Sequence, residues 1–271
     1  MNELFNIEGK VIAITGATGI LAGDLARYLL SQGAKVAILS RSADKVAAAV
    51  EEAKSISPHV MGAACDVTSQ SDVQAAHDAL LTHFGAVDAL INGAGGNMPG
   101  ATIGPDADLF SLDINDYASV MNLNLQGTLI PSMVFGKTFA KQQRGNIINF
   151  SSMTAAQAVT RVLGYSNAKA AVDNLTRWMA TEMAQRFGDQ VRVNAVAPGF
   201  FISHQNRRLL TNEDGSLTER GEQVVRKTPM GRFGDAPEVF GAAHYLLSDA
   251  SAFVTGTVLA VDGGFSCYSG V

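Results

Sequence analysis

Short apolar runs alternate with longer amphipathic segments along the whole chain, and this alternation predicts strands and helices in turn. An apolar run that ends at turn residues is typical of a buried strand, whereas apolar residues spaced three and four apart predict a helix. The predicted strands are residues 11–14, 36–39, 59–64, 89–91, 146–150, 191–195 and 258–261. The predicted helices are residues 20–30, 46–53, 73–84, 117–140, 165–187 and 236–247.

Regular alternation of strand and helix predicts an α/β fold with a parallel sheet and helices on both faces. Right-handed crossovers then give a Rossmann-like, doubly wound sheet of about seven strands. Residues 1–271 show no repeat or linker, so we expect a single nucleotide-binding domain. Residues 96–115 and 200–226 resist assignment and follow strand ends. Because ligands of open α/β sheets bind outside the carboxyl ends of the strands, we expect these two loops to face the substrate.

Composition and charge narrow the possible partners. Hydrophobic residues make up 47% of the chain and charged residues 17%, below the usual share of roughly 25%, which suits a sheet covered on both faces. The net charge of −5 and the lack of a basic block predict no nucleic-acid partner. No apolar run is long enough for a membrane span, and residues 1–10 lack a signal-peptide core.

The cysteines point to a reducing compartment. Cys65 and Cys267 lie far apart, without the spacing of a metal-binding or redox motif. We therefore expect two free thiols, no metal site and a cytoplasmic location.

A glycine-containing loop joins the first strand to the first helix and predicts a pyrophosphate site. Glycines allow a tight turn there, and the helix N-terminus offers free N–H groups and a partial positive charge. The expected contacts are Gly16, Thr18, Gly19, Ile20 and Leu21.

The end of the second strand indicates which cofactor binds. An acidic residue at this place would bind the ribose hydroxyl of NAD, but the chain carries Ser40 and Arg41 instead. An arginine can hold the additional phosphate of NADP through charge-assisted hydrogen bonds. We therefore favour NADP(H), with NAD(H) left open.

Tyr165 and Lys169 stand four residues apart at the start of a predicted helix, so they share one face. A free phenol has a pKa near 10 and is a poor base at neutral pH. A nearby ammonium stabilises phenolate and lowers that pKa. Tyr165 could then donate a proton to a ketone oxygen or remove one from an alcohol.

With these residues the sequence resembles the short-chain dehydrogenase/reductase family over nearly its whole length. Tyr165 and Lys169 match the family's Tyr-x-x-x-Lys motif, and Ser152, thirteen residues upstream, matches its serine. Asn124 matches the asparagine of the Asn-Leu-x-Gly segment. The resemblance implies that Tyr165 is the general acid/base, that Ser152 binds the substrate oxygen, and that Lys169 lowers the pKa of Tyr165 and holds the cofactor ribose. It also implies that Asn124 anchors a proton-relaying water.

Further family motifs imply further cofactor contacts. They are the Asp-Val pair, the Asn-x-Ala-Gly turn and the Pro-Gly pair after the sixth strand. Their residues are Asp66, Val67, Asn92, Ala94, Gly95, Pro198 and Gly199, and the terminal Asp-Gly-Gly follows at 262–264.

The glycine loop departs from the family pattern. Ile20 and Ala22 occupy the second and third glycine positions of the family pattern, while Gly19 and Gly23 sit one residue away. We therefore expect the path of the loop to be shifted relative to the family's.

Several segments resemble the group of D-mannonate oxidoreductases, also called fructuronate reductases. They are the Gly-Gly-Asn loop at 95–97, the segments at 198–207 and 228–234, and the tail at 263–271. A sugar acid needs amides for its hydroxyls and a cation for its carboxylate. Besides Ser152, the candidate substrate residues are Asn97, Arg161, Gln205, Asn206 and Arg207. The family resemblance also implies a homotetramer.

Other functions stay open at this point. A 3-oxoacyl thioester reductase and another polyol or gluconate dehydrogenase would keep the enzyme class but change the small carbonyl or alcohol substrate. From other classes, the fold could serve a non-catalytic NADP-sensing regulator or an interaction protein. The presence of all four residues Asn124, Ser152, Tyr165 and Lys169 favours an enzyme.

Overall fold

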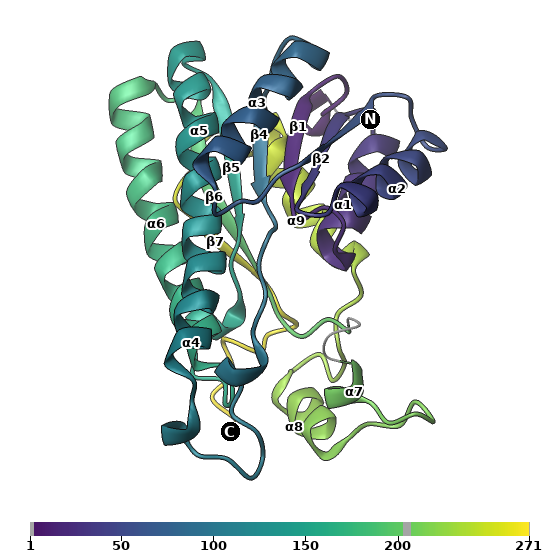
Figure 1. Ribbon diagram of the computed structural model, residues 1–271, viewed down its shortest axis with the longest axis vertical. Helices are drawn as coiled ribbons and strands as arrows, with labels where there is room; N and C mark the ends of the chain where they lie inside the picture. The colour runs from purple at the N-terminus through teal and green to yellow at the C-terminus, as the bar shows by residue number, and fades with distance from the viewer. Residues whose placement is uncertain (1–2, 203–206, 271) are drawn as a thin grey trace.

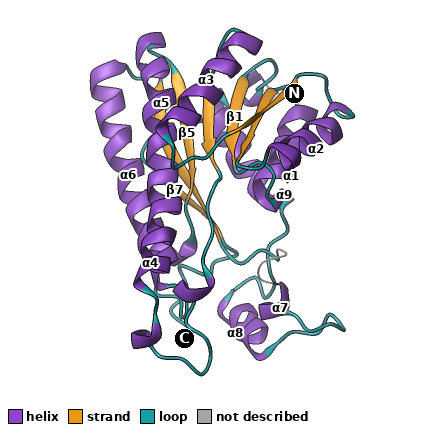
Figure 2. Cartoon of the chain, in the orientation of Figure 1, coloured by secondary structure: helices purple, strands orange, loops and turns teal. Residues whose placement is uncertain are grey.

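In the computed structural model, which describes residues 3–202 and 207–270, seven parallel strands form one sheet in the order β3-β2-β1-β4-β5-β6-β7. Figure 2 shows these strands at the centre of the molecule between helices. The strands are β1 Val11–Thr15, β2 Lys35–Ser40, β3 Val60–Ala64, β4 Ala89–Asn92, β5 Gly145–Phe150, β6 Val191–Pro198 and β7 Val258–Val261. The seven-stranded, doubly wound sheet confirms the predicted fold class, whereas a single domain over residues 1–271 stays a prediction.

Helices cover both faces of the sheet (Figure 1). The helices α1 Ile20–Ser31, α2 Ala43–Lys54 and α9 Pro237–Leu247 pack on one face through side chains such as Leu25 and Leu246. The helices α3 Gln70–Phe84, α5 Gly127–Gln142 and α6 Leu163–Phe187 pack on the other through Leu80 and Phe135. No described helix is both long and apolar enough to cross a membrane.

Strand β1 shows why the apolar runs form a central sheet. Its residues point alternately to the two faces, so that Ile12 and Ile14 join one core cluster while Val11 and Ala13 join the other. All five residues of the strand are buried. Burial on both faces is the reason that such strands read as continuous apolar runs.

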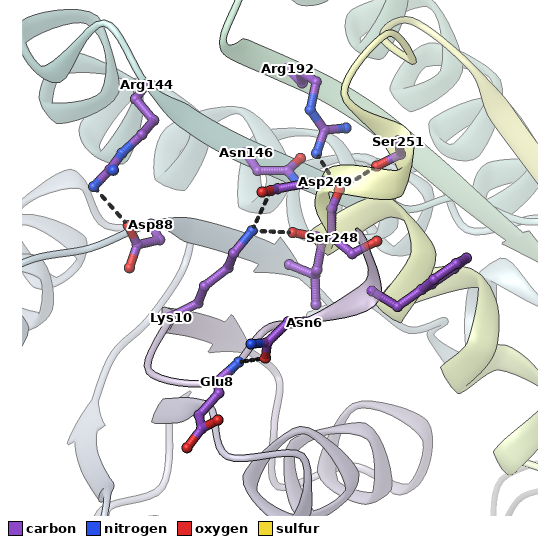
Figure 3. Close-up of polar contacts among 12 residues, drawn as sticks. Asn6, Glu8, Lys10, Asp88, Arg144, Asn146, Arg192, Ser248, Asp249 and Ser251 are labelled. Carbon is purple, nitrogen blue, oxygen red and sulfur yellow. Dashed lines mark hydrogen bonds and ion pairs between the residues drawn. The ribbon is translucent and has the colours of Figure 1, made fainter. Parts of the chain in front are cut away.

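A polar cluster at the amino ends of the strands holds the C-terminus of α9 (Figure 3). The guanidinium of Arg192 donates to the carbonyl oxygens of Leu246 at 2.8 Å and Val254 at 3.1 Å. The ammonium of Lys10 donates to Leu247 O at 3.1 Å and pairs with Asp249 at 2.9 Å. Because the last carbonyls of a helix lack intrahelical partners, these cations act as its cap. The cluster is therefore structural, and it lies at the opposite end of the strands from the predicted site.

Two segments differ from the sequence prediction. The helix expected at 117–140 begins earlier, as α4 Ile114–Met121, and a π-helical segment, Asn122–Gln126, separates it from α5. The stretch at 200–226 contains the short helix α7 Arg207–Leu210 and the longer α8 Glu219–Lys227. Helix α8 has only two large apolar side chains, Val224 and Val225, which are too few for a helix to be recognised in the sequence from its apolar residues.

Candidate active site

The predicted site residues stand on loops that leave the carboxyl ends of neighbouring strands. The sheet register places Thr15 beside Asn92, and Asn92 beside Asn149. Between β1 and β4 the strand order changes direction. In open α/β sheets this switch point is where the ligand crevice lies, so the candidate residues meet where a nucleotide is expected to bind.

The loop from β1 to α1 is built for close approach of its backbone. Gly16 has a φ of +69°, and a Cβ placed on it would lie 2.7 Å from the Cα of Ala94. The hydroxyl of Thr15 accepts hydrogen bonds from the N–H groups of Gly93 and Ala94, at 3.1 and 3.2 Å, and so ties the two loops together. Helix α1 begins at Ile20 with Gly19 as its N-cap. This glycine cradle in front of a helix N-terminus fits a dinucleotide pyrophosphate.

The departure from the family pattern at Ala22 is accommodated by a second glycine. A Cβ on Gly93 would lie 2.9 Å from the Cβ of Ala22 and 2.8 Å from the carbonyl oxygen of Thr15. The missing side chain at position 93 therefore makes room for the methyl group at position 22. Gly23 lets helix α1 pack closely against the loop before it, since a Cβ there would lie 3.0 Å from the carbonyl oxygen of Ala17.

The ends of β2 and β3 carry polar groups beside this loop. The hydroxyls of Thr18 and Ser40 lie 2.7 Å apart and share a hydrogen bond. The side chain of Arg41 follows, exposed to solvent. The Asp66 carboxylate accepts from the hydroxyl and the N–H of Thr68, and these bonds together with the charge of Arg41 hold the pKa of Asp66 below its usual value. A cation and two hydroxyls thus gather where a ribose or its phosphate would sit.

Ser152, Tyr165 and Lys169 come together after β5 and at the start of α6. The side chain of Tyr165 is hydrogen-bonded to that of Ser152. The ammonium of Lys169 lies 5.5 Å from the centre of the Tyr165 ring and donates to the carbonyl oxygen of Phe150 at 2.8 Å. Ser152 itself caps the turn that follows it, accepting from the N–H of Thr154 at 3.3 Å. The predicted catalytic hydroxyls therefore do share one site.

Burial sets the protonation states of this group. Burial lowers the pKa of Lys169 to about 8, although the nearby carboxylate of Asp173 opposes that shift. Burial also raises the pKa of Tyr165, and the hydrogen bond with Ser152 offsets only part of that rise. Desolvation disfavours the charged form of both groups, which explains why the two shifts have opposite signs. At neutral pH Tyr165 is a neutral phenol that can give up a proton, and burial outweighs the lowering of its pKa that was expected from Lys169.

Asn124 lies in the π-helical segment, fully buried. Its amide group donates to the carbonyl oxygens of Gly96 at 2.7 Å and Val120 at 2.8 Å, and its oxygen accepts from the N–H of Gly96 at 3.2 Å. A Cβ on Gly95 would lie 2.6 Å from that oxygen and 3.3 Å from the ammonium of Lys169. Asn124 thus fixes the loop after β4 against Lys169.

Asp173 is a neighbour of the site that the sequence analysis missed. It is buried one turn after Lys169 and accepts a hydrogen bond from the hydroxyl of Ser151. Burial raises the pKa of Asp173, while Ser151 and the cations Arg177 and Lys169 favour its ionised form. The spacing could have revealed Asp173, because it lies four residues after Lys169 and its partner Ser151 is next to Ser152.

A family model described as enoyl-(acyl carrier protein) reductase, which represents short-chain dehydrogenases/reductases, matches residues 16–266. The chain belongs to the short-chain dehydrogenase/reductase family. It is therefore an oxidoreductase that acts on CH–OH groups with NAD(P), which confirms the enzyme prediction and sets aside the non-catalytic alternatives.

Relatives of this short-chain dehydrogenase/reductase resemble it from end to end. An uncharacterised oxidoreductase of Bacillus subtilis named UxuB is 42% identical, with 98% of each chain covered. A Haemophilus influenzae protein to which D-mannonate oxidoreductase activity has been ascribed, crystallised with NAD, is 39% identical, with a TM-score of 0.91 and 98% of each chain covered. A gluconate 5-dehydrogenase from Burkholderia cenocepacia, crystallised with NADP and tartrate, is 31% identical, with a TM-score of 0.86 and 98% of each chain covered.

Two of the predicted cofactor contacts, Asn92 and Gly199, have only backbone atoms available to a nucleotide. The side chain of Asn92 points into the core, where it donates to Ser132 and Asn149 at 2.9 Å each. Only its backbone can therefore approach a nucleotide. Gly199, after Pro198, donates its N–H to Val261 O at 2.9 Å, and a Cβ on it would lie 2.7 Å from the Cα of Asp262. The Pro-Gly turn thus packs on the terminal Asp-Gly-Gly segment.

The predicted substrate residues are less closely grouped. The amide of Asn97 donates to Thr102 at 2.8 Å, and its buried oxygen has no hydrogen-bond partner within the described residues. Arg161 precedes Tyr165 by four residues, whereas Arg207 is exposed at the start of α7. Gln205 and Asn206 lie outside the described residues.

Proposed function

We propose that this enzyme interconverts a ketone and a secondary alcohol on a sugar acid of the D-fructuronate/D-mannonate type. The observation that carries the proposal is the Ser152–Tyr165–Lys169 cluster with an arginine, Arg161, on the loop that leads into it. Such a site offers hydrogen bonds and a proton at one place and a cation for a carboxylate nearby. The 39% identity to a protein with ascribed D-mannonate oxidoreductase activity supports the same substrate class.

In the proposed reaction Ser152 and Tyr165 both donate hydrogen bonds to the carbonyl oxygen of the ketone. A bound nicotinamide supplies the hydride for the carbonyl carbon. As negative charge develops on the oxygen, Tyr165 transfers its proton there, so that the product is a neutral alcohol. The positive charge of Lys169 stabilises the phenolate left behind, and we expect its ammonium also to hold the nicotinamide ribose.

We propose that Tyr165 recovers its proton through water held beside Asn124. The two N–H bonds of the Asn124 amide are already donated to backbone carbonyls. Its oxygen accepts one hydrogen bond, from Gly96, and a carbonyl oxygen has two lone pairs. The second lone pair is the place for a water.

We propose that NADP(H) is preferred over NAD(H), with Arg41 as the residue that decides it. Replacing Arg41 with serine removes a cation from the expected position of the 2′-phosphate. Because a hydrogen bond to a charged group contributes about 1.5–3 kcal/mol, kcat/KM for NADPH should fall roughly 10- to 100-fold while that for NADH changes little. Steady-state rates with each cofactor measure both values. Lys45→Ser, an exposed cation four residues further on, is the control and should leave both values unchanged. An equal loss with both cofactors would contradict the assignment.

The substrate is tested by initial rates with D-fructuronate. We expect turnover with NADPH above that with NADH, and turnover by the Tyr165→Phe protein at least about 100-fold lower. A 3-oxoacyl thioester, gluconate and a neutral polyol, each paired with the appropriate form of the cofactor, serve as competing substrates. If one of them is turned over and D-fructuronate is not, the sugar-acid proposal fails while the enzyme class stands.

We also propose that the enzyme is a cytoplasmic homotetramer whose residues 1–271 form one domain. Support for assembly comes from large apolar side chains on the outer surfaces of α5 and α6. Met133 is 56% exposed and Trp178 is 64% exposed. Large apolar side chains exposed on packed helices are expected at contacts between subunits.

A further inference from the structure

Two arginines that lie far apart in the sequence, Arg161 and Arg220, come close to each other beside the segment that leads into Tyr165. The guanidinium of Arg220, on α8, donates to the hydroxyl and the carbonyl oxygen of Thr160, at 3.1 and 3.2 Å. Arg161 is the next residue along the chain and is close enough for its positive charge, together with burial, to lower the pKa of Arg220. Helix α8 thus brings a second cation to the segment that leads into Tyr165.

No carboxylate of the described residues forms an ion pair with either arginine. The Nε of Arg220 is buried and has no hydrogen-bond partner within the same residues. Both side chains are partly buried rather than extended into solvent. Two like charges near each other repel, and an unpaired buried donor costs free energy. An anion bound between them would relieve both costs.

The backbone at Arg161 provides an independent observation. Its φ of +78° lies in the left-handed region, which glycine adopts readily and other residues rarely do. The carbonyl oxygen of Arg161 accepts from the N–H of Ile103 at 3.0 Å, which holds the residue in this conformation. Strained backbone of this kind gathers at ligand-binding sites. A long cationic side chain at a position that suits glycine therefore indicates that the side chain has a function.

We propose that Arg161 and Arg220 together bind the carboxylate of the substrate. The inference rests on the proposed sugar-acid function and adds the residues that select for the acid. A guanidinium matches a carboxylate through two parallel hydrogen bonds. Arg161 precedes Tyr165 by four residues, so the pair lies on the segment that enters the catalytic helix, and we expect a sugar acid held there by its carboxylate to extend its ketone toward Ser152 and Tyr165. Neutral ketoses and polyols lack the group that the pair binds.

The test uses three single variants of the full chain. Arg161→Gly removes one cation and also relieves the backbone strain, so this protein should stay folded. Arg220→Met removes the other cation. Arg226→Met, an exposed arginine on the same helix, is the matched control. For D-fructuronate with NADPH we expect KM to rise roughly 10- to 100-fold in the first two proteins, with kcat changed far less, and to stay unchanged in the third.

A binding measurement separates this site from the proposed substrate. Calorimetric titration with D-gluconate and with its neutral counterpart D-glucitol probes the carboxylate without turnover. We expect D-gluconate to bind the natural protein more tightly than D-glucitol, and this preference to disappear in Arg161→Gly and Arg220→Met but not in Arg226→Met. If D-fructuronate is not a substrate but the preference and its loss are seen, the carboxylate site stands and the substrate proposal fails.

Two other results would contradict the proposed carboxylate site. Turnover of D-fructuronate with the same KM in all three variants would show that the two arginines do not bind the carboxylate, although the proposed function would stand. Equal binding of D-gluconate and D-glucitol by the natural protein would also overturn the site. Circular dichroism and thermal unfolding of each variant show whether a loss of binding reflects loss of fold.

Discussion

Replacing Tyr165 with phenylalanine is expected to lower kcat for ketone reduction about 100- to 10,000-fold, the range usual for loss of a general acid. The change deletes one oxygen atom and keeps the ring. Burial holds the phenol in its neutral, proton-donating form, and the side chain of Ser152 interacts with it. Ser152 can polarise the carbonyl oxygen, but it is a much weaker acid than a phenol. Single-turnover rates of NADPH oxidation measure the chemical step separately from binding and product release.

Tyr117→Phe is the matched control for this substitution. The hydroxyl of Tyr117 accepts a hydrogen bond from the exposed Asn167 at 3.1 Å and belongs to α4, outside the catalytic group. We expect its kcat to stay within about twofold, because an exposed hydrogen bond contributes little. NADPH fluorescence should show that both proteins still bind the cofactor. If Tyr165→Phe keeps more than a tenth of the natural kcat, the proton comes from another group.

The strands could be predicted almost to the residue because a parallel sheet leaves a strong signal. The apolar runs at 11–14 and 258–261 fall within β1 and β7, and the run at 146–150 falls within β5. Strands covered on both faces must be apolar throughout, and turn residues mark where they end. Right-handed crossovers then predict a doubly wound sheet, although they do not fix the order in which the strands pair.

The segments that could not be predicted are held by contacts distant in sequence. Helix α8 carries mainly charged residues, and its place is fixed by contacts such as Arg220 with Thr160. The π-helical segment carrying Asn124 lies inside what reads as one continuous helix. Its geometry is tied to hydrogen bonds between Asn124 and Gly96, 28 residues earlier. Periodicity reports which face of an element is buried, but it does not report such pairings.

The residues of the candidate site likewise differ in whether the sequence could predict them. Tyr165 and Lys169 could be found from spacing, because four residues on a helix place two side chains on one face. Ser152 and Asn124 were found only through the family resemblance. Arg220 was missed entirely, since nothing near it in the sequence indicates that α8 reaches the segment before Tyr165.

Lys169→Met is expected to lower kcat/KM for ketone reduction about 100-fold on the plateau at neutral pH. The ammonium lies 5.5 Å from the centre of the Tyr165 ring. At an effective dielectric constant of about 20, a unit charge at such a distance stabilises the phenolate by about 3 kcal/mol, which corresponds to roughly 100-fold in rate. Lys137→Met, an exposed lysine on α5, removes the same group elsewhere and should have no effect.

The pH profile of kcat/KM also tests whether the charge of Lys169 is needed, because the pH at which kcat/KM declines should move in a known direction when Asp173 is replaced. Because burial lowers the pKa of Lys169 to about 8, the side chain is charged below that pH and neutral above it. In the natural protein kcat/KM for reduction should therefore be constant at neutral pH and fall as pH rises through about 8. Asp173 raises the pKa of Lys169, so Asp173→Asn should move this decline to lower pH. In Lys169→Met the decline should disappear along with the charge. A decline that keeps its position in both variants would assign it to another group, and Lys169 would then act only by holding the cofactor.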